Sequence, residues 1–407
     1  MNILLLNAGS SSLKAALVES DDGRDLASGL ADWAGSVTRY QYTGPDGKDR
    51  STEVPWKGHA PAVQSFVADL LQTKPVALAD RSALWAVGHR FVHGGEFTSS
   101  VQITPEIRSR LAALADLAPL HNPPSLEALA AAEAELPGVP HVAVFDTAFH
   151  ATLPPHAWTY PVPGRWTRDW GIRRFGFHGL SHAYCARRAA EMLERPIENL
   201  RLVICHLGHG CSAAAVQGGQ CVDTTMGFTP LEGLMMGTRS GSIDPSIVVH
   251  VQERHGLTTD QVETALNRES GLLGVSGVSG DMRQVLAAAK AGKEPARLAL
   301  AIYAHRVRQA IGALTVTMGG VDALVFTAGV GEHSREIRES ICVGLDCLGL
   351  ELDRNANAGA RPDADIARRE SRSRILIIAT REDVTMLREV MQVLGGTRNV
   401  SAAEGKK

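Results

Sequence analysis

The sequence lacks the marks of several large protein classes. No apolar run approaches the ~20 residues that a membrane-spanning helix requires, and the chain opens without a basic leader, so we expect neither membrane contact nor a secretory signal. The six cysteines show no C-x-x-C spacing, which argues against a zinc site. These features predict a cytoplasmic protein in a reducing compartment.

Aromatic residues and excess charge are also scarce. Aromatics make up 5% of the chain and hydrophobic residues 44%, and the formal net charge at pH 7 is −3. A nearly balanced charge gives no electrostatic basis for binding nucleic acid. For 407 residues, this composition predicts an α/β protein of about two or three domains.

The chain has no P-loop motif, G-x-x-x-x-G-K-[ST], but another candidate phosphate loop lies at its N-terminus. An apolar run at residues 3–6 breaks into N-A-G-S-S-S-L-K at 7–14, and a second apolar run follows at 15–18. Small side chains let backbone N–H groups approach an anion, while Ser10, Ser12 and Lys14 add donors. The pattern predicts a β-hairpin whose loop holds phosphate.

A second strand–loop–strand pattern begins at residue 202. Gly208, Gly210 and Ala213 fit the dinucleotide fingerprint G-x-G-x-x-A, but that motif requires a following helix, and the glycine pair at 218–219 comes too soon for one. A hairpin with a second phosphate loop is therefore favoured over a NAD site. A third strand at 323–327 runs into an expected glycine turn at 328–333. Two hairpin loops roughly 200 residues apart predict an internally duplicated nucleotide-binding fold.

The remaining segments are assigned from apolar periodicity and proline positions. We expect hairpins or loops at 35–60, two helices around a proline turn at 111–136, a helix at 178–194, a long buried helix at 294–318 that includes Leu298, a last strand at 374–379 and a helix at about 383–394. The duplication predicts an N-terminal lobe of 1–148 rejoined by about 384–395, and a C-terminal lobe of 149–383 with the nucleotide site. We expect the tail 396–407 to be disordered.

Several longer motifs carry a family resemblance. They are N-A-G-S-S-S-L-K at 7–14, G-H-R-F-V-H-G-G-E at 88–96, L-A-P-L-H-N-P-P at 117–124, V-F-D-T-A-F-H at 144–150, R-F-G-F-H-G-L-S-H at 174–182, M-G-F-T-P-L-E-G-L-M-M-G-T-R-S-G-S-I-D-P at 226–245 and F-T-A-G-V-G-E at 326–332. Over about residues 1–395 the chain resembles the acetate kinases. The resemblance implies an α/β, two-lobed, duplicated actin-like ATPase fold with ribonuclease H-like halves and the nucleotide in the cleft between the lobes.

The same resemblance implies an activity. It is the reversible, Mg²⁺-dependent transfer of the γ-phosphoryl group of ATP to acetate, which gives acetyl phosphate and ADP by direct in-line displacement. Mn²⁺ is a possible substitute for Mg²⁺, and a homodimer is implied. A propionate or butyrate kinase of the same family is the alternative. A sugar or polyol kinase of the wider fold group, and an actin-like or Hsp70-like ATPase module, are more distant alternatives.

The site residues follow from the same motifs. The resemblance implies a catalytic set of Asp146, Arg90, Arg239 and His178, and a substrate pocket of Arg90, Val92, Leu120, Phe177 and Pro230. The implied nucleotide-binding residues are Lys14, Ser10, Ser12, His206, Leu207, Gly208, His209, Gly210, Asp281, Met282, Arg283, Gly329, Val330 and Gly331. Asn7 and Glu382 are the implied metal residues.

Asp146 is not expected to act as a general base. Carboxylic acids titrate near ~4, so acetate is already ionised at pH 7 and needs no proton removed. We expect Asp146 to orient Arg90 or Arg239, or to hold a Mg²⁺-bound water. A sugar kinase, with a hydroxyl nucleophile, would instead need Asp146 as a base.

The chain departs from the family pattern at three places: His209 in the second phosphate loop, His333 after Gly331-Glu332, and Arg381 after the last strand. An imidazole at position 209 either carries charge near pH 6 or is a tolerated, uncharged replacement.

Overall fold

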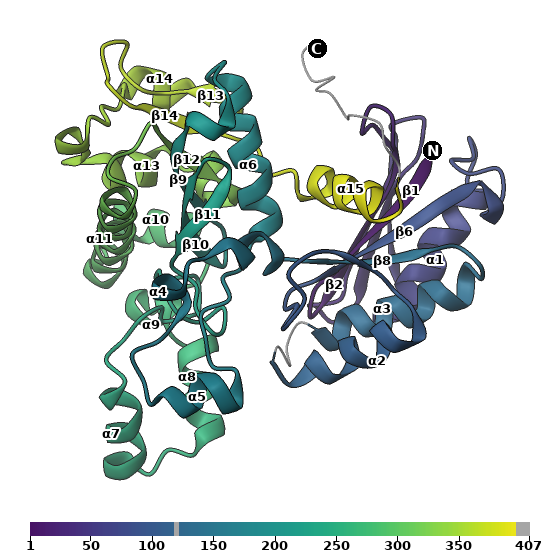
Figure 1. Cartoon of the computed structure of the whole chain (residues 1–407), viewed down its shortest axis with the longest axis horizontal. Coiled ribbons are helices and arrows are strands. Elements are labelled where there is room, and N and C mark those ends of the chain that lie inside the picture. Colours follow the sequence, from purple (N-terminus) through teal and green to yellow (C-terminus); the bar gives the residue numbers. More distant parts are fainter. Residues whose placement is uncertain (118–121, 396–407) are drawn as a thin grey trace. The chain divides into compact units, whose positions relative to one another are not determined.

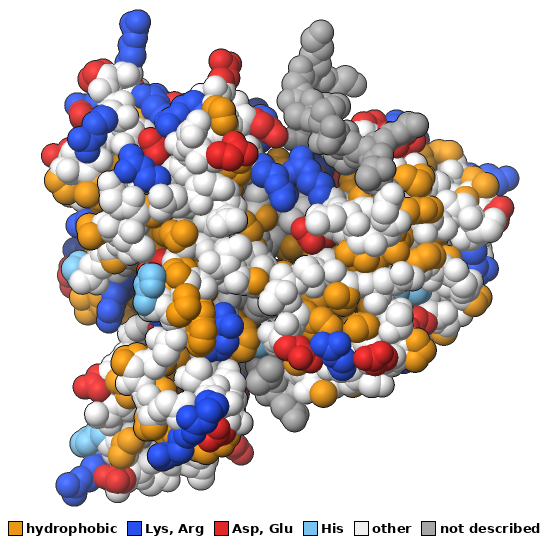
Figure 2. Space-filling view, viewed as in Figure 1, with side chains coloured by type: hydrophobic (Ala, Val, Ile, Leu, Met, Phe, Trp, Pro, Cys, Tyr) orange, Lys and Arg blue, Asp and Glu red, His pale blue; other side chains and the backbone are white. Residues whose placement is uncertain are grey.

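The computed structural model describes residues 1–117 and 122–395, which form two compact units (Figure 1). Unit 1 comprises Met1–Ala148 and Arg381–Lys407, and unit 2 comprises Phe149–Thr380. Leu120 and the tail expected to be disordered lie outside the described residues. None of the described helices combines the length and the apolar character needed to cross a bilayer. Figure 2 shows acidic and basic side chains interspersed over the described part of the visible face.

Unit 1 is built on an eight-stranded sheet with the order β5-β4-β3-β2-β1-β6-β8-β7. Its strands are β1 (Asn2–Ala8), β2 (Ser12–Glu19), β3 (Asp25–Asp32), β4 (Thr38–Thr43), β5 (Asp49–Val54), β6 (Leu84–Phe91), β7 (Val101–Gln102) and β8 (His141–Phe145). The first five strands form an antiparallel meander, and β1, β6 and β8 are parallel neighbours. The predicted hairpin at the N-terminus is confirmed, with Asn7 paired to Lys14.

Helices cover both faces of this sheet. They are α1 (His59–Gln72), α2 (Pro105–Ala113), α3 (Asn122–Glu135) and α15 (Glu382–Val393). Alternating residues of β1 serve the two faces, as the period of a strand requires. Leu4 and Leu6 belong to the core cluster that also contains residues of α1 and α3. On the other face, a Cβ added to Gly88 would lie 2.7 Å from Val390 of α15 and 3.0 Å from Leu5. A glycine in β6 therefore lets α15 pack closely.

Unit 2 is built on a six-stranded sheet with the order β11-β10-β9-β12-β14-β13. Its strands are β9 (Arg201–Leu207), β10 (Cys211–Gln217), β11 (Gln220–Thr224), β12 (Ala323–Thr327), β13 (Ala364–Asp365) and β14 (Arg374–Ile377). Its helices are α4 (Pro155–Trp158), α5 (Gly164–Trp170), α6 (Gly179–Met192), α7 (Ser246–His255), α8 (Thr259–Arg268), α9 (Gly271–Ser276), α10 (Met282–Lys290), α11 (Glu294–Thr317), α12 (Ala328–His333), α13 (Arg335–Cys342) and α14 (Arg354–Gly359).

The two sheets share one topology. In unit 1 the antiparallel set β3-β2-β1 continues into the parallel set β1-β6-β8, and in unit 2 the antiparallel set β11-β10-β9 continues into the parallel set β9-β12-β14. Both candidate phosphate loops therefore join the first two strands of a ribonuclease H-like sheet. The predicted α/β fold with two related halves is confirmed.

Two local predictions were wrong. The segment expected to be a glycine turn at 328–333 is the short helix α12, which begins as soon as β12 ends. Ala328 there has φ of 63°, and its N–H donates to Thr380 Oγ1 over 3.0 Å, which turns the chain directly into the helix. The helix expected to be buried at 294–318 is α11, and only one of its faces is buried. Leu298, expected in the core, is 56% exposed.

Candidate active site

Arg90 is the centre of a charged group in unit 1. Its Nε and Nη2 donate to the two carboxylate oxygens of Asp146 over 3.0 and 2.6 Å, and its Nη1 lies 3.1 Å from Glu382 Oε2. Asn7 Oδ1 accepts from Arg90 Nη1 over 3.2 Å, and Asn7 Nδ2 lies 3.5 Å from Glu382 Oε2. Asp146 is 1% exposed. One guanidinium is thus fixed by two carboxylates and an amide.

The sheet explains why these residues meet. Arg90 lies near the end of β6, Asp146 directly follows β8, and the two strands are parallel neighbours. The Asp146 N–H also donates to Phe91 O over 3.0 Å. Asn7 lies near the end of β1, which is the other neighbour of β6, and Glu382 begins α15. Polar side chains at the carboxyl ends of adjacent parallel strands form a typical ligand site.

The charge of Arg90 is secure. Burial opposes the charged form, but the carboxylates of Asp146 and Glu382 outweigh it and raise the pKa of Arg90. A permanent, oriented cation can bind a carboxylate or a phosphoryl oxygen. Such a group can position anionic reactants but has no proton to exchange.

The first predicted phosphate loop also lies in unit 1. Gly9, Ser10 and Ser11 connect β1 to β2, and the Gly9 N–H donates to Ser12 O over 2.8 Å, which closes a tight turn. Ser10 and Lys14 are exposed, so their donors are accessible. Val92, proposed for the substrate pocket, follows β6 and is partly buried.

The second predicted phosphate loop lies in unit 2. His206 and Leu207 end β9, Gly208, His209 and Gly210 form the connection, and the Gly208 N–H donates to Gly210 O over 3.0 Å. The two hairpins thus carry loops of the same length at equivalent places in their sheets.

His209 is exposed, and its ring also packs over a glycine. A Cβ added to Gly237 would lie 2.6 Å from His209 Nδ1, and the Gly237 N–H donates to His209 O over 3.0 Å. Burial of this inner side and, next, the positive charge of Arg239 lower the pKa of His209, while Asp281 opposes that shift. The ring is therefore neutral at pH 7 in the nucleotide-free protein.

Arg239 and His178 lie around Gly210. A Cβ added to Gly210 would lie 3.4 Å from His178 Nε2 and 3.6 Å from Arg239 Nη1. Arg239 Nη1 also donates to Pro230 O over 3.1 Å, so the arginine is tied to a residue proposed for the acyl pocket. Phe177, also proposed for that pocket, is 1% exposed, and its carbonyl oxygen accepts from His150 Nε2 over 2.9 Å.

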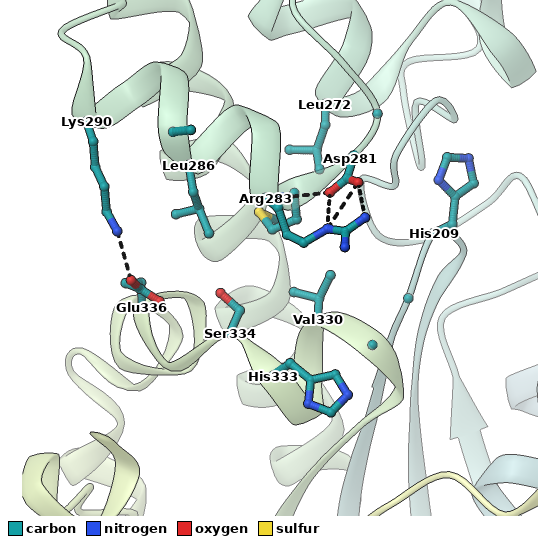
Figure 3. Close-up of a pocket in the computed structure, with 15 residues that line it drawn as sticks. His209, Leu272, Asp281, Arg283, Leu286, Lys290, Val330, His333, Ser334 and Glu336 are labelled. Carbon is teal, nitrogen blue, oxygen red and sulfur yellow. Dashed lines mark hydrogen bonds and ion pairs between the residues drawn. The ribbon is translucent and has the colours of Figure 1, made fainter. Parts of the chain in front are cut away.

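A cavity of about 710 Å³ opens beside the second phosphate loop (Figure 3). Its lining includes several predicted nucleotide residues: Gly208, His209, Asp281, Met282, Arg283, Gly329 and Val330. The predicted nucleotide residues of unit 2 that do not line it are His206, Leu207, Gly210 and Gly331; Lys14, Ser10 and Ser12 belong to unit 1. Figure 3 shows Arg283 folded over Asp281, with Nη2 2.5 Å from Oδ2. This hydrogen bond from Arg283 is the main cause that lowers the pKa of Asp281.

Several residues of the site were missed by sequence reasoning. Lys290 of α10 and Glu336 of α13 line the cavity, and their charged groups lie 3.1 Å apart (Figure 3). Ser212 contacts the predicted catalytic histidine, with Ser212 Oγ 2.9 Å from His178 Nδ1, and His182 Nε2 lies 2.8 Å from the same serine oxygen. The four-residue spacing of His178 and His182 at the start of the helix predicted at 178–194 was the available signal that both rings lie on one side of it.

The fold and the site define a class. Two ribonuclease H-like sheets in one chain, with phosphate loops at equivalent hairpins, make an actin-like ATPase fold, and the arginines and the cavity fit a nucleotide-dependent phosphotransferase. The sequence matches the Acetokinase family over residues 2–388.

Relatives and solved structures agree. The chain is 47% identical to an acetate kinase of Thermoanaerobacter pseudethanolicus over 98% of this chain and 100% of that protein. The Porphyromonas gingivalis acetate kinase structure has a TM-score of 0.90 at 40% identity, over 97% of this chain and 99% of that one. A Francisella tularensis propionate kinase structure has a TM-score of 0.88 at 36% identity, over 95% and 98%. The chain belongs to the acetokinase family.

Proposed function

We propose that this protein transfers the γ-phosphoryl group of ATP to acetate, reversibly, and forms acetyl phosphate and ADP. The observation that carries this proposal is the family match over residues 2–388, a range that contains all the residues proposed here for catalysis. The proposal assigns Arg90, Asp146, Asn7 and Glu382 in unit 1, and His178, Arg239 and the nucleotide cavity in unit 2.

The chemistry requires charge neutralisation more than proton transfer. In-line phosphoryl transfer spreads negative charge over the equatorial oxygens of the transferred group, and fixed cations stabilise it. Arg90 and Arg239 supply such cations. Since the acetate nucleophile is already ionised, Asp146 is assigned to hold Arg90 by its two hydrogen bonds of 3.0 and 2.6 Å rather than to remove a proton.

Nucleotide binding is assigned to unit 2. The cavity of about 710 Å³ is large enough for a nucleoside, and its wall combines Leu272, Leu286 and Val330 with the glycines of two loops. The N–H groups of the second phosphate loop and of the first, with Lys14, Ser10 and Ser12, are assigned to phosphate contacts. Asp281 and Arg283 are assigned to the nucleoside end.

Mg²⁺ fits the oxygen donors beside Arg90. Asn7 supplies an amide oxygen and Glu382 a carboxylate, and Mg²⁺ prefers one or two such ligands together with phosphates and waters. Among the described residues, no cluster of three or more His, Cys, Asp or Glu side chains is placed to hold a metal, so no all-protein cage competes with this assignment. A metal bound there neutralises phosphate charge; Mn²⁺ is the proposed substitute.

Propionate or butyrate is the alternative acceptor, and the similarity to a propionate kinase structure supports this alternative. We assign Val92, Phe177 and Pro230 to the acyl chain, together with Leu120. A methylene is worth only about 1–3 kcal/mol of discrimination in such a pocket. Propionate should therefore react more slowly than acetate without being excluded.

The test is acyl phosphate formation, trapped with hydroxylamine, from ATP and Mg²⁺ with acetate, propionate or butyrate. We expect acetate to give the highest kcat/KM and His178→Ala to abolish most of the signal with every acid. A higher kcat/KM with propionate or butyrate would select the alternative, and no acyl phosphate from any acid would overturn the proposal. A homodimer is proposed from the family resemblance. A cytoplasmic location is proposed from the six unpaired cysteines, which suit a reducing compartment.

A further inference from the structure

A buried serine bridges the candidate catalytic histidine and a second histidine. Ser212 lies on β10 and is 0% exposed, and its Oγ lies 2.9 Å from His178 Nδ1 and 2.8 Å from His182 Nε2. His178 precedes α6 as its N-cap with φ of 57°, and His182 lies in the first turns of α6. Residues four apart share one side of a helix start, so both rings face the same strand residue.

The number of available protons limits the directions of the two hydrogen bonds that join His182, Ser212 and His178. A serine hydroxyl has one proton, so Ser212 donates to one imidazole and accepts from the other. Burial, and next the neighbouring His150 and His206, hold the pKa of His182 well below its usual value, so its ring is neutral and carries one N–H. His182 Nδ1 is buried without a hydrogen-bond partner among the described residues. A proton on Nδ1 would leave a buried N–H unpaired, which is costly, whereas a proton on Nε2 is satisfied by Ser212.

We propose that Ser212 and His182 are positioning residues that keep His178 in the tautomer with its proton on Nε2. His182 Nε2–H donates to Ser212 Oγ, Ser212 O–H donates to His178 Nδ1, and the neutral His178 ring then carries its proton on Nε2. This inference rests on the proposed role of His178 in phosphoryl transfer.

The tautomer decides what His178 presents to an anion. Nε2 lies 3.4 Å from where a Cβ on Gly210 would be, and Arg239 Nη1 lies 3.6 Å from the same point. With the proton on Nε2, an N–H donor and a guanidinium flank one position on the phosphate loop. With the proton on Nδ1, a lone pair would face a phosphoryl oxygen and repel it.

A ring stack holds the plane of His178 independently. His206 of β9 stacks on it with ring centres 4.1 Å apart at 18°, and His206 Nδ1 lies 2.8 Å from Ser181 Oγ. The stack can fix the position of the ring but not its tautomer, because a stacked face exchanges no proton with it. Ser212, which contacts Nδ1, is placed to set the tautomer.

The direct test is ¹⁵N NMR of the whole protein labelled at histidine, with His178→Asn to assign the His178 signals. We expect a protonated Nε2 and a hydrogen-bond-accepting Nδ1 for His178 at pH 8. In Ser212→Ala the Nδ1-protonated form should become populated. A wild-type His178 with its proton on Nδ1 would overturn the inference, whatever the activity of the variants.

Kinetics provide the second test. Ser212→Ala should lower kcat about 10²-fold, as expected for loss of one transition-state donor, with little change in KM for acetate or ATP. Ser212→Thr keeps the hydroxyl and should recover most of kcat; Ser212→Cys is a second replacement if the threonine does not fold. Thr224→Val is the matched control, because it removes a buried hydroxyl from β11, where Thr224 Oγ1 donates to Ala213 O over 3.0 Å. It should leave kcat unchanged.

The outcomes separate this inference from the proposed function. In a His178→Ala background, Ser212→Ala should cause no further loss, because the two residues act in sequence. An equal loss of kcat in both backgrounds, or a wild-type kcat for Ser212→Ala, would overturn the positioning role of Ser212. The proposed phosphorylation of acetate would still stand. A wild-type enzyme that forms no acyl phosphate would instead refute the proposed function, and the NMR result would still decide the tautomer.

Discussion

Replacing Asp146 with asparagine tests whether this residue holds Arg90 or removes a proton. Asparagine keeps the size of the side chain and one oxygen acceptor, but it loses the charge and the second acceptor. Of the two hydrogen bonds at 3.0 and 2.6 Å, one is therefore lost and the other loses its charge assistance. Arg90 retains Glu382 at 3.1 Å, so it stays charged and near its place.

The size of the effect follows from these contacts. A hydrogen bond to a charged group is worth about 1.5–3 kcal/mol, and the pair is almost fully buried, with Asp146 at 1% exposure. Since each 1.36 kcal/mol corresponds to a tenfold rate change, kcat/KM for acetate should fall about 10- to 100-fold. Loss of a general base would cost roughly 10²–10⁴, so the magnitude alone overlaps and a sharper measurement is needed.

A double-mutant cycle with Arg90→Ala separates the two roles. If Asp146 acts through Arg90, Asp146→Asn in the Arg90→Ala background should change kcat/KM by less than about threefold, because the interaction is already lost. The pH profiles of wild type and Asp146→Asn should be parallel from pH 6 to 9. A full additive loss, or an acidic limb present in wild type and missing in the variant, would refute the positioning role. Thermal unfolding of each variant controls for stability, because an unpaired buried charge is destabilising.

Three further results are expected. Arg239→Ala should lower kcat by roughly 10²–10³, while Arg90→Ala should also raise KM for acetate; unchanged kcat in both folded variants would remove the two arginines from the site. Val92→Ala should shift kcat/KM about tenfold toward propionate, within the range for a methylene, and a fixed acetate-to-propionate ratio would show that Val92 does not contact the acyl chain. Phosphate oxygens should raise the lowered pKa of His209, so ATP binding takes up protons and tightens as pH falls from 8 to 6, beyond the titration of ATP itself. His209→Asn should remove that extra dependence in calorimetric titrations, and identical profiles would show that His209 stays uncharged.

Much of the fold could be predicted from the chain because its strands are nearly uninterrupted apolar runs. The hairpin of β9 and β10 followed from the Gly218-Gly219 pair, and the register pairing Cys211 with Leu207 agrees with it. The exposed surfaces of helices were harder to predict. Leu298 has the spacing of a core residue, yet it lies on the outer face of α11. Periodicity counts apolar residues but does not report which neighbours a helix face has.

Contacts between distant segments were the part that sequence could not supply. Asp146 was expected to orient Arg90 or Arg239, and it does contact Arg90, but nothing in the chain indicated that Arg90 would also contact Glu382. Asp146 and Glu382 are separated from Arg90 by 56 and 292 residues of chain, and the parallel pairing of β6 with β8 and the return of α15 bring them together. Ser212 was not singled out from the sequence, and its proposed role depends on His178 and His182, at the start of α6, lying against β10.

The repeated topology gives a physical reason for the division of labour proposed here. Each sheet exposes a tight hairpin loop whose N–H groups suit phosphate, and beside it the ends of parallel strands, where side chains of any kind can be presented. In unit 1 the strand ends carry Arg90 and Asp146, which suit a carboxylate acceptor and its charge. In unit 2 the end of the corresponding strand β12 runs directly into α12, whose Gly329 and Val330 line the cavity proposed for the nucleoside. The same strand arrangement can therefore serve two different reactants, because the residues at the strand ends differ between the two sheets.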